Sequence, residues 1–353
     1  MSDIILDDLH FITSYLKKEL MQLQGKKIFI AGASGMLASY IVKTLLYANE
    51  HLFRTNAKLY LVIRKKIKPF GQSKYINYLH SDIASPTAQL SAIKNIDYLI
   101  HAASPAAPKI YLQNRVETLR SNILGLFNLL NLANSKTKSF LYFSTSEIYG
   151  NPQQKESINE NYFGLIDHLS PRSNYVEAKK ICETICMNYF IEKKTPIKIA
   201  RIFHTFGPGL NLEDGRVFSD FIKNGLAGNT IDIKGNKKAT RSLLYLKDAT
   251  IMFLKILLSK KNGQIYNVGN DKNTVSVQKM AEIVASIVNG YSQKKIRVTF
   301  AKKPHIKYYA NAPLSIKPNI QKFVNAFGYR PSTDVATAFS RTLSYYRARR
   351  HNE

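Results

Sequence analysis

The first half of the chain alternates short, continuous apolar segments with helical segments. We expect strands at residues 26–31, 59–63, 76–80, 98–102, 140–143 and 197–203. Strands without polar alternation are buried on both faces, which is typical of a parallel sheet covered by helices. The alternation therefore predicts an α/β fold built on a doubly wound parallel sheet.

A glycine turn follows the first of these strands. Residues 32–38 read Gly-Ala-Ser-Gly-Met-Leu-Ala and lead into a helix that we expect to reach Leu46. Glycines let a backbone approach a pyrophosphate, and a helix N-terminus offers free N–H groups and a positive dipole. The spacing G-x-x-G-x-x-A also suits a purely structural turn. In this context we expect a dinucleotide site of the Rossmann type at the carboxyl ends of the strands, where Gly32, Arg64, Asp82, Ala103 and 144–147 fall.

The second strand ends without an acidic residue. It runs into Arg64, Lys65 and Lys66, so no carboxylate is present there to hold a ribose 2′-hydroxyl. Arg64 and Lys65 could instead meet a 2′-phosphate, although a merely basic loop explains them equally well. We expect NAD as the cofactor and keep NADP open.

The remaining segments suggest how the chain is divided. Residues 1–24 have the pattern of an amphipathic helix, with apolar side chains at Ile5, Leu9, Ile12, Leu16 and Leu20. Beyond residue 205 the chain becomes glycine-punctuated, with a short strand at 265–268 and helical patterns at 276–289 and 333–347. We predict an N-terminal helical extension (1–24), a dinucleotide-binding domain (25–205 with 240–270) and a smaller α/β substrate domain (206–239 with 271–353).

Composition excludes several classes of protein. The 353 residues are 45% hydrophobic, enough for a large core. The chain shows no charged-then-apolar leader and no apolar run of about 18 residues, so we expect a soluble cytoplasmic protein without a membrane partner. Cys182 and Cys186 are the only cysteines; we expect reduced, core or near-core thiols and no metal site.

The net charge of +27 would suit a nucleic-acid partner. The charge is spread over the chain as lysine-rich positions, however, and no nucleic-acid-binding motif occurs. We expect a solvated basic surface, no nucleic-acid partner, and a field that attracts an anionic diphosphate.

Residues 170–180, SPRSNYVEAKK, place Tyr175 and Lys179 four apart. On a helix they share a face, so the ammonium of Lys179 is expected to lower the pKa of the Tyr175 phenol. Such a phenol can exchange protons with a sugar alcohol. A tyrosine and a lysine at this spacing, without other motifs, are more often ordinary surface residues of a helix. Residues 144–147, Ser-Thr-Ser-Glu, follow the strand at 140–143 and open at the same sheet edge.

With these motifs in order, the chain resembles an extended short-chain dehydrogenase/reductase of the nucleotide-sugar epimerase, dehydratase and decarboxylase group. The resemblance covers about residues 25–345 and rests on GASGMLAS, SDI (81–83), HAASPAAP (101–108), RSNILGLFNLL (120–130), STSEIYG (144–150), PRSNYVEAKK, RIFHTFGPG (201–209) and EDGRVFSDF (213–221). Within this group the chain looks most like the UDP-glucuronate decarboxylases.

The resemblance implies a tightly held NAD and a nucleotide-sugar substrate that is transiently oxidised at C4. Tyr175 would remove the O4 proton, Lys179 would hold the nicotinamide ribose, Thr145 would hydrogen-bond O4 and Glu147 would act as acid or base near C5 or C6. The cofactor would lie against Gly32, Ser34, Gly35, Met36, Leu37, Asp82, Ile83, Ala102, Ala103, Ser104 and Asn122, with Arg64 added from the strand end, and the substrate against Ser146, His204, Arg216 and Arg241. An ion pair with Glu213 or Asp214 is the structural alternative for Arg216.

Two positions depart from the decarboxylase pattern. His204 stands where these enzymes carry asparagine, and could be a substrate ligand, a catalytic acid or a hydrogen-bonded core residue. Ile316 stands where they carry the arginine that meets the uronate carboxylate, so Lys317 or another base would have to replace it.

Decarboxylation, 4-epimerisation and 4,6-dehydration therefore remain open, as do the sugar and the base. The resemblance also implies a homodimer through a four-helix interface to which the Tyr175 helix contributes. The alternative to an enzyme is a non-catalytic protein that senses NAD(P) or serves as a scaffold. In such a protein we would expect the Tyr/Lys pair or the glycine turn to be lost by substitution, and both are intact.

Overall fold

The computed structural model describes residues 2–85, 93–152, 157–300 and 315–350. Its centre is a seven-stranded sheet in the order β10-β6-β5-β4-β1-β2-β3. The strands are β1 (Lys27–Ala31), β2 (Lys58–Ile63), β3 (Ile76–His80), β4 (Tyr98–His101), β5 (Ser139–Thr145), β6 (Ile197–Ile202) and β10 (Gln264–Val268). Every neighbouring pair is parallel, which confirms the predicted doubly wound parallel sheet.

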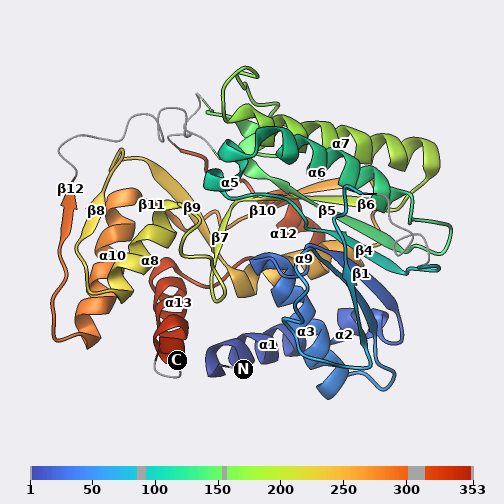
Figure 1. Ribbon diagram of the computed structural model, residues 1–353, viewed down its shortest axis with the longest axis horizontal. Helices are drawn as coiled ribbons and strands as arrows, with labels where there is room; N and C mark the ends of the chain where they lie inside the picture. Colours follow the sequence, from blue (N-terminus) through green and yellow to red (C-terminus); the bar gives the residue numbers. More distant parts are fainter. Residues whose placement is uncertain (1, 86–92, 153–156, 301–314, 351–353) are drawn as a thin grey trace.

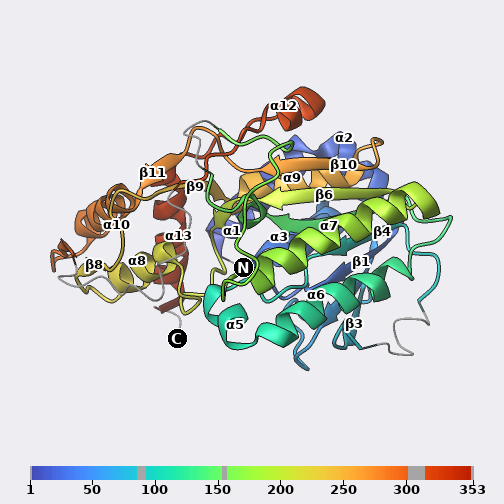
Figure 2. The same ribbon diagram turned by 90° about the horizontal axis from the view of Figure 1, so that it is seen from above.

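Helices cover both faces of this sheet (Figures 1 and 2). One face carries α3 (Met36–His51), α9 (Leu246–Leu258) and the N-terminal α1 (Asp3–Tyr15) and α2 (Lys17–Leu20), the last continued by the 3₁₀ turn η1 (Met21–Leu23). The other face carries α6 (Arg115–Leu130) and α7 (Ser173–Lys193), which pack side by side, with the short α5 (Pro108–Gln113) preceding α6. The strands are apolar throughout because both of their faces are buried in this way.

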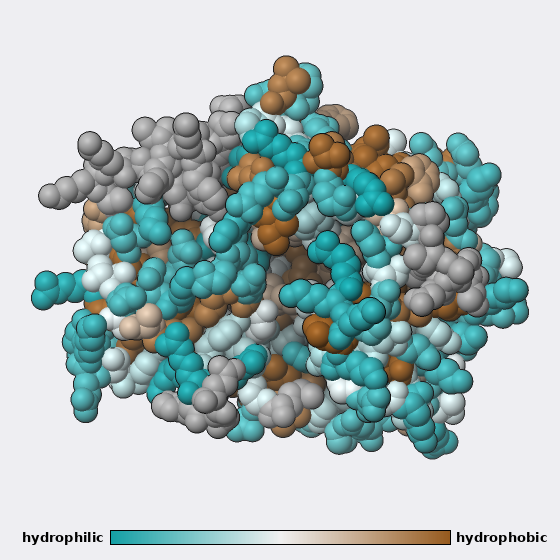
Figure 3. Space-filling view, viewed as in Figure 1, coloured by the Kyte–Doolittle hydropathy of each residue, from teal (hydrophilic) through white to brown (hydrophobic). Residues whose placement is uncertain are grey.

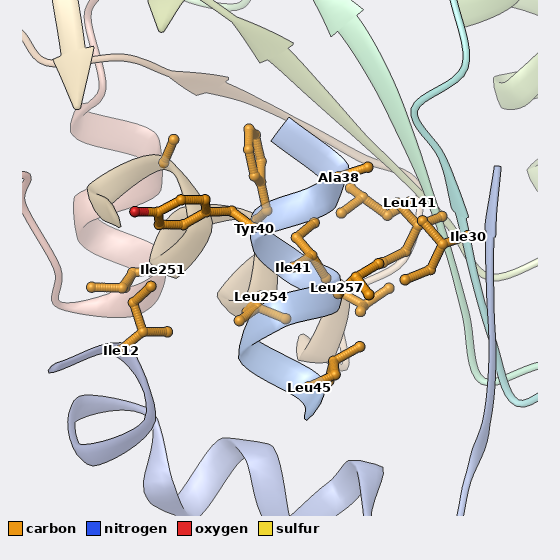
Figure 4. Packing of buried hydrophobic residues seen from close by; sticks show 14 of the residues in the cluster. Ile12, Ile30, Ala38, Tyr40, Ile41, Leu45, Leu141, Ile251, Leu254 and Leu257 are labelled. Atoms are coloured by element: carbon orange, nitrogen blue, oxygen red, sulfur yellow. The ribbon is translucent and has the colours of Figure 1, made fainter. Parts of the chain in front are cut away.

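The core beneath α3 and α9 joins distant segments (Figure 4). Tyr40 and Ile41 of α3 pack with Leu254 and Leu257 of α9 and with Ile30 of β1. All five side chains are fully buried. This packing fixes α3, and therefore the turn that precedes it, against the carboxyl edge of the sheet.

A smaller part of the chain lies beyond that edge. It contains a three-stranded sheet, β11-β9-β7, and a two-stranded sheet, β12-β8. Its elements are β7 (His204–Phe206), α8 (Val217–Leu226), β8 (Ile231–Ile233), β9 (Thr240–Tyr245), β11 (Thr274–Ser276), α10 (Val277–Tyr291), β12 (Val298–Phe300) and α13 (Val335–Arg350), while α12 (Gln321–Phe327) packs near β10. These elements enclose their own apolar cluster, centred on Phe206, Phe218 and Phe339.

The predicted N-terminal helix is present but stops at Tyr15, after which α2 and η1 continue the segment. The five apolar positions of the predicted segment, Ile5, Leu9, Ile12, Leu16 and Leu20, are all buried. The division of the chain into domains stays a prediction. In the structure β9, which we grouped with the dinucleotide-binding part, pairs with β7 and β11, whereas the following α9 and β10 belong to the large sheet.

Both cysteines are free and buried. Across the described ranges, no helix combines the length and the apolar character that a membrane span requires.

Candidate active site

The residues expected at the cofactor and substrate gather where the parallel strands end. Gly32 follows β1, Arg64 follows β2, Ala102 follows β4 and Thr145 ends β5. Because neighbouring parallel strands end at one edge, these positions meet there. The structure confirms that the carboxyl edge of the sheet brings them together.

The glycine turn forms a cradle of backbone. Gly32 has φ +78°, and its N–H donates to the carbonyl of Val62 at 3.1 Å. A Cβ at this position would lie 2.6 Å from the Cα of Ala103, so only glycine fits without moving the backbone. Gly35 then caps α3, whose first N–H groups have no intrahelical partner. This cradle fits the pyrophosphate of a dinucleotide.

Several residues expected at the cofactor are held in place by neighbouring parts of the chain. Asp82 accepts the N–H of Ala84 at 2.9 Å, and the Ser104 hydroxyl donates to the Asn122 side chain at 3.0 Å. Ile83 packs so closely on Gly125 that an added Cβ there would lie 2.6 Å from it. These contacts give the wall of the expected cofactor site a fixed shape.

A cavity of about 310 Å³ opens beside the turn. In Figure 3 this face of the molecule is hollowed near its centre, between the part with the large sheet and the part with α8, α10 and α13. The predicted site residues that line the cavity are Gly35, Met36, Leu37, Ala102, Ser104, Thr145, Ser146, Glu147, Tyr175, Lys179, His204, Arg216 and Arg241. Those outside its lining are Gly32, Ser34, Arg64, Asp82, Ile83, Ala103 and Asn122.

Tyr175 and Lys179 lie one turn apart on α7 and are both buried. The ammonium of Lys179 donates to the Phe143 carbonyl at 2.8 Å and lies 5.9 Å from the centre of the Tyr175 ring. The Tyr175 ring stacks on Tyr111, with ring centres 4.9 Å apart. These contacts hold both functional groups in fixed positions inside the cavity.

The expected lowering of the Tyr175 pKa by Lys179 is wrong for this structure. Burial raises the pKa of Tyr175, and the negative charge of Glu147 raises it further. The hydrogen bond with Thr145 and the charge of Arg216 only partly oppose these effects. Burial also lowers the pKa of Lys179, to about 8, so its charge is itself disfavoured.

Thr145 and Glu147 are placed by the end of β5. There the chain turns into the 3₁₀ helix η2 (Ser146–Tyr149), and the Thr145 hydroxyl accepts the N–H of Glu147 at 3.2 Å. The Glu147 carboxylate then lies 3.6 Å from the guanidinium of Arg172 and 3.5 Å from the Tyr111 hydroxyl. Arg172 also donates to the Tyr111 hydroxyl at 2.9 Å.

The sequence did not indicate Arg172 and Tyr111 as site residues. Arg172 stands three residues before Tyr175, within the segment that drew attention to the Tyr/Lys pair. That spacing put Arg172 near Tyr175 but carried no signal that it would meet Glu147. Tyr111 lies in α5, three residues after the HAASPAAP motif, and no sequence pattern indicates that it reaches the site.

His204 lies on β7, and its ring stands edge-on to Phe218, with ring centres 6.4 Å apart. Its Nδ1 is buried and has no hydrogen-bond partner among the described residues. Burial lowers the pKa of His204 to about 3, and the charges of Arg241, Arg216 and Arg172 contribute. The imidazole is therefore neutral, which favours a hydrogen-bonding role over that of a catalytic acid.

Arg216 and Arg241 lie on the side of the cavity formed by the smaller part of the chain. Arg216 forms an ion pair with the buried Asp214, donating from Nε to Oδ2 at 2.7 Å, which is the structural role considered for it. Arg241 donates to the Thr240 carbonyl at 2.7 Å. Burial lowers the pKa of Arg241, and the negative charge of Glu147 partly offsets this effect.

Ile316 is buried and lines the cavity. It belongs to an apolar cluster that includes Tyr111, Ile148, Val176 and Phe203. The side chain of Lys317 is exposed and lies outside the cavity lining, so Lys317 does not replace an arginine at this place. The described ranges also contain no group of three or more His, Cys, Asp or Glu side chains placed to hold a metal ion.

Curated relatives match most of the chain. UDP-glucuronic acid decarboxylase 1 of Danio rerio is 27% identical over 332 residues, which cover 93% of this chain and 74% of the relative. UDP-glucuronic acid decarboxylase 1 of Arabidopsis thaliana is 29% identical over 332 residues, which cover 93% of this chain and 71% of the relative.

Two solved structures show the same fold. UDP-glucose 4-epimerase of Thermotoga maritima, solved with UDP-glucose, has a TM-score of 0.78 at 18% identity and covers 92% of this chain and 99% of that one. The dTDP-glucose 4,6-dehydratase of Streptomyces venezuelae, solved with NAD and TYD bound, has a TM-score of 0.76 at 19% identity. It covers 92% of this chain and 98% of that one.

A family model described as the NAD dependent epimerase/dehydratase family matches residues 28–269. The match spans the glycine turn, β5 with Thr145, and the helix of Tyr175 and Lys179. It confirms the predicted family and its NAD-type cofactor. The chain belongs to the NAD dependent epimerase/dehydratase family.

Proposed function

We propose that this enzyme acts on a nucleotide-linked sugar through transient oxidation at C4, in the manner of a UDP-glucuronate decarboxylase. One observation carries the proposal: Thr145, Glu147, Tyr175 and Lys179 line a single cavity beside a glycine cradle. The names of the curated relatives and of the solved structures support it, because they are nucleotide-sugar decarboxylases, epimerases and dehydratases.

The cofactor is proposed to lie along the carboxyl edge of the sheet. Its pyrophosphate would meet the turn, and its adenosine and inner parts would meet the residues predicted after the other strands; the full set is Gly32, Ser34, Gly35, Met36, Leu37, Arg64, Asp82, Ile83, Ala102, Ala103, Ser104 and Asn122. When bound, the nicotinamide supplies a hydride acceptor for sugar C4. Lys179, held at the Phe143 carbonyl, is placed to hold the nicotinamide ribose.

Tyr175 is proposed to take the proton from the sugar O4, with Thr145 hydrogen-bonding the same oxygen. In the structure both side chains face the cavity, and the pKa of Tyr175 is raised by burial and by Glu147. A positive charge near the phenol would favour its ionised form. A bound nicotinamide in its oxidised, cationic state would bring such a charge.

Glu147 and Arg172 are proposed to handle the chemistry at C5 and C6. A ketone at C4 makes a C6 carboxylate a β-keto acid, whose C5–C6 bond breaks with release of carbon dioxide. The electron pair of that bond passes into an enolate of the C4 ketone, which is then protonated at C5. Arg172, 3.6 Å from Glu147, is a cation placed to meet a carboxylate in this part of the cavity. Glu147 is the group placed to supply the proton that C5 gains.

A 4-epimerase or a 4,6-dehydratase is the second candidate, and Ile316 favours it. A buried isoleucine at the cavity wall suits an uncharged C6 group better than a carboxylate, since an unpaired buried charge is costly. On this candidate Glu147 would remove the C5 proton in a dehydration, or would have only a minor role in epimerisation.

The nucleotide diphosphate is proposed to lie against Arg216 and Arg241, with Ser146 and His204 near the sugar. Arginine suits bidentate contact with phosphate oxygens. The positive charge of these side chains, added to the overall charge of +27, favours an anionic substrate.

We also propose a homodimer formed through α6 and α7. Large apolar side chains remain exposed on these neighbouring helices: Val116, Leu119, Leu124, Phe127, Ile181 and Ile191. Covering them against a second copy would remove this surface from water. Light scattering should give a molar mass of twice 40.1 kDa.

The test is incubation of the purified protein with a panel of UDP-, dTDP-, GDP- and CDP-sugars. Product mass separates loss of carbon dioxide from loss of water, and an unchanged mass with an altered sugar proton spectrum identifies epimerisation. Tyr175→Phe should bind cofactor like the wild type and turn over at least about a hundredfold more slowly, as expected on loss of an acid–base group. No turnover of any sugar by the wild type, with cofactor still bound, would favour the NAD(P)-sensing protein.

A further inference from the structure

The end of β2 lies beside the glycine turn. Ala31 of β1 pairs with Val62 of β2, and the N–H of Gly32 donates to the Val62 carbonyl. Arg64 therefore begins the loop that borders the turn. The N–H of Ser81 donates to the Ile63 carbonyl at 3.3 Å, so the chain after β3 closes the other side. In a doubly wound sheet this place belongs to the adenosine ribose of a dinucleotide.

The charged side chains of the loop between β2 and β3 are all positive. No Asp or Glu occurs between Glu50 and Asp82, whereas five Lys and Arg residues occur between 64 and 74. Arg64, Lys65 and Lys66 are exposed. The Arg64 guanidinium has no hydrogen bond or ion pair with any other part of the chain that the structure describes, so it is available to a ligand.

Asp82 does not supply the missing carboxylate. It follows β3 and not β2. One of its oxygens accepts the N–H of Ala84 at 2.9 Å, and the other lies 3.8 Å from the guanidinium of Arg120 on α6. Its charge is thus partly balanced within the protein.

We propose that this site selects the 2′-phosphorylated cofactor, NADP, over NAD, with Arg64 as the specificity-determining side chain. In dinucleotide sites of this type a carboxylate accepts the hydrogen bond of the ribose 2′-hydroxyl, whereas cations bind a 2′-phosphate, to which arginine can donate two hydrogen bonds. The inference rests on the proposed function for the position of the cofactor in the site. It does not depend on which sugar is used.

The test is calorimetric titration of the cofactor-free, full-length protein with NADP and with NAD. Wild type should bind NADP at least about tenfold more tightly than NAD. Arg64→Ala should weaken NADP binding by at least about tenfold and leave the affinity for NAD unchanged, as expected for loss of hydrogen bonds to a charged group. Arg54→Ala is the matched control: Arg54 is also exposed but precedes β2, at the opposite end of the strand. It should leave both affinities unchanged.

Added salt should weaken NADP binding more than NAD binding, because the phosphate contact is ionic. If some cofactor stays bound through purification, its mass after denaturation should be that of NADP. Equal or tighter binding of NAD by the wild type would overturn the inference. So would an Arg64→Ala variant that loses affinity equally for both cofactors. Tight NAD binding together with nucleotide-sugar turnover would refute this inference alone, whereas failure to bind either cofactor would refute the proposed function as well.

Discussion

At the scale of single residues, the cavity is defined by groups whose charge state is set by burial. His204 shows this most clearly, because burial and three nearby arginines lower its pKa to about 3 from an ordinary 6.5. In the unfolded chain the imidazole takes up a proton as the pH falls below 6.5, whereas in the folded protein it does not. The free energy of unfolding therefore decreases as the pH falls from 6.5 toward 3.

His204→Asn removes this contribution while keeping a neutral hydrogen-bonding side chain. We expect the variant to lose less stability than the wild type between pH 6.5 and pH 4, as measured by urea unfolding at each pH. His101, which has the same direction of shift, remains in both proteins and cancels. An identical acid response in the two proteins would show that His204 is not held neutral by the fold.

At the scale of elements, α6 and α7 form a pair whose outer side exposes several large apolar side chains. Val116 on α6 is 78% exposed, so Val116→Glu changes no core contact and puts a charge on the proposed dimer surface. We expect light scattering to show a dimer for the wild type and a monomer for this variant. Ile67→Glu, at an exposed apolar residue in the loop after β2, is the control and should remain dimeric. A monomeric wild type, or a variant that stays dimeric, would contradict the proposed interface.

The elements of the large sheet could be predicted from the sequence because burial on both faces leaves a continuous apolar run in each strand. The glycine turn could be predicted because its backbone conformation excludes other residues, as Gly32 shows. The contact of Arg172 with Glu147 could not, since it arises only when the N-terminal end of α7 packs against η2. The raised pKa of Tyr175 was likewise hidden, because it depends on how deeply Tyr175 is buried.

At the scale of the whole molecule, Asp8 connects four distant segments. This buried carboxylate on α1 accepts hydrogen bonds from Tyr40 of α3 at 2.8 Å, Tyr245 of β9 at 2.7 Å and Arg341 of α13 at 3.0 Å. It thereby ties the N-terminal helix to the large sheet's helical layer and to the smaller part of the chain. The sequence pattern of residues 1–24 is that of an amphipathic helix, and it does not indicate that Asp8 is buried.

Asp8→Ala should lower the free energy of unfolding by about 2–4 kcal/mol, because it leaves the buried hydroxyls of Tyr40 and Tyr245 without their acceptor and removes the buried carboxylate that pairs with Arg341. Asp7→Ala is the matched control. Asp7 is 68% exposed and 3.7 Å from Arg341, so its loss should cost about 0.5 kcal/mol or less. Denaturant unfolding compares the two, and equal effects would mean that the buried network does not hold these segments together.

The proposed reaction begins with oxidation of a nucleotide sugar at C4. Its most direct test is a single-turnover experiment in which enzyme with bound cofactor is mixed with each nucleotide sugar of the panel, unlabelled or deuterated at C4, and the absorbance of the reduced nicotinamide is followed. We predict a transient rise in this absorbance with at least one sugar, slowed by deuterium at C4 and absent in Tyr175→Phe. No rise with any sugar, or a rise that deuterium at C4 does not slow, would contradict the claim.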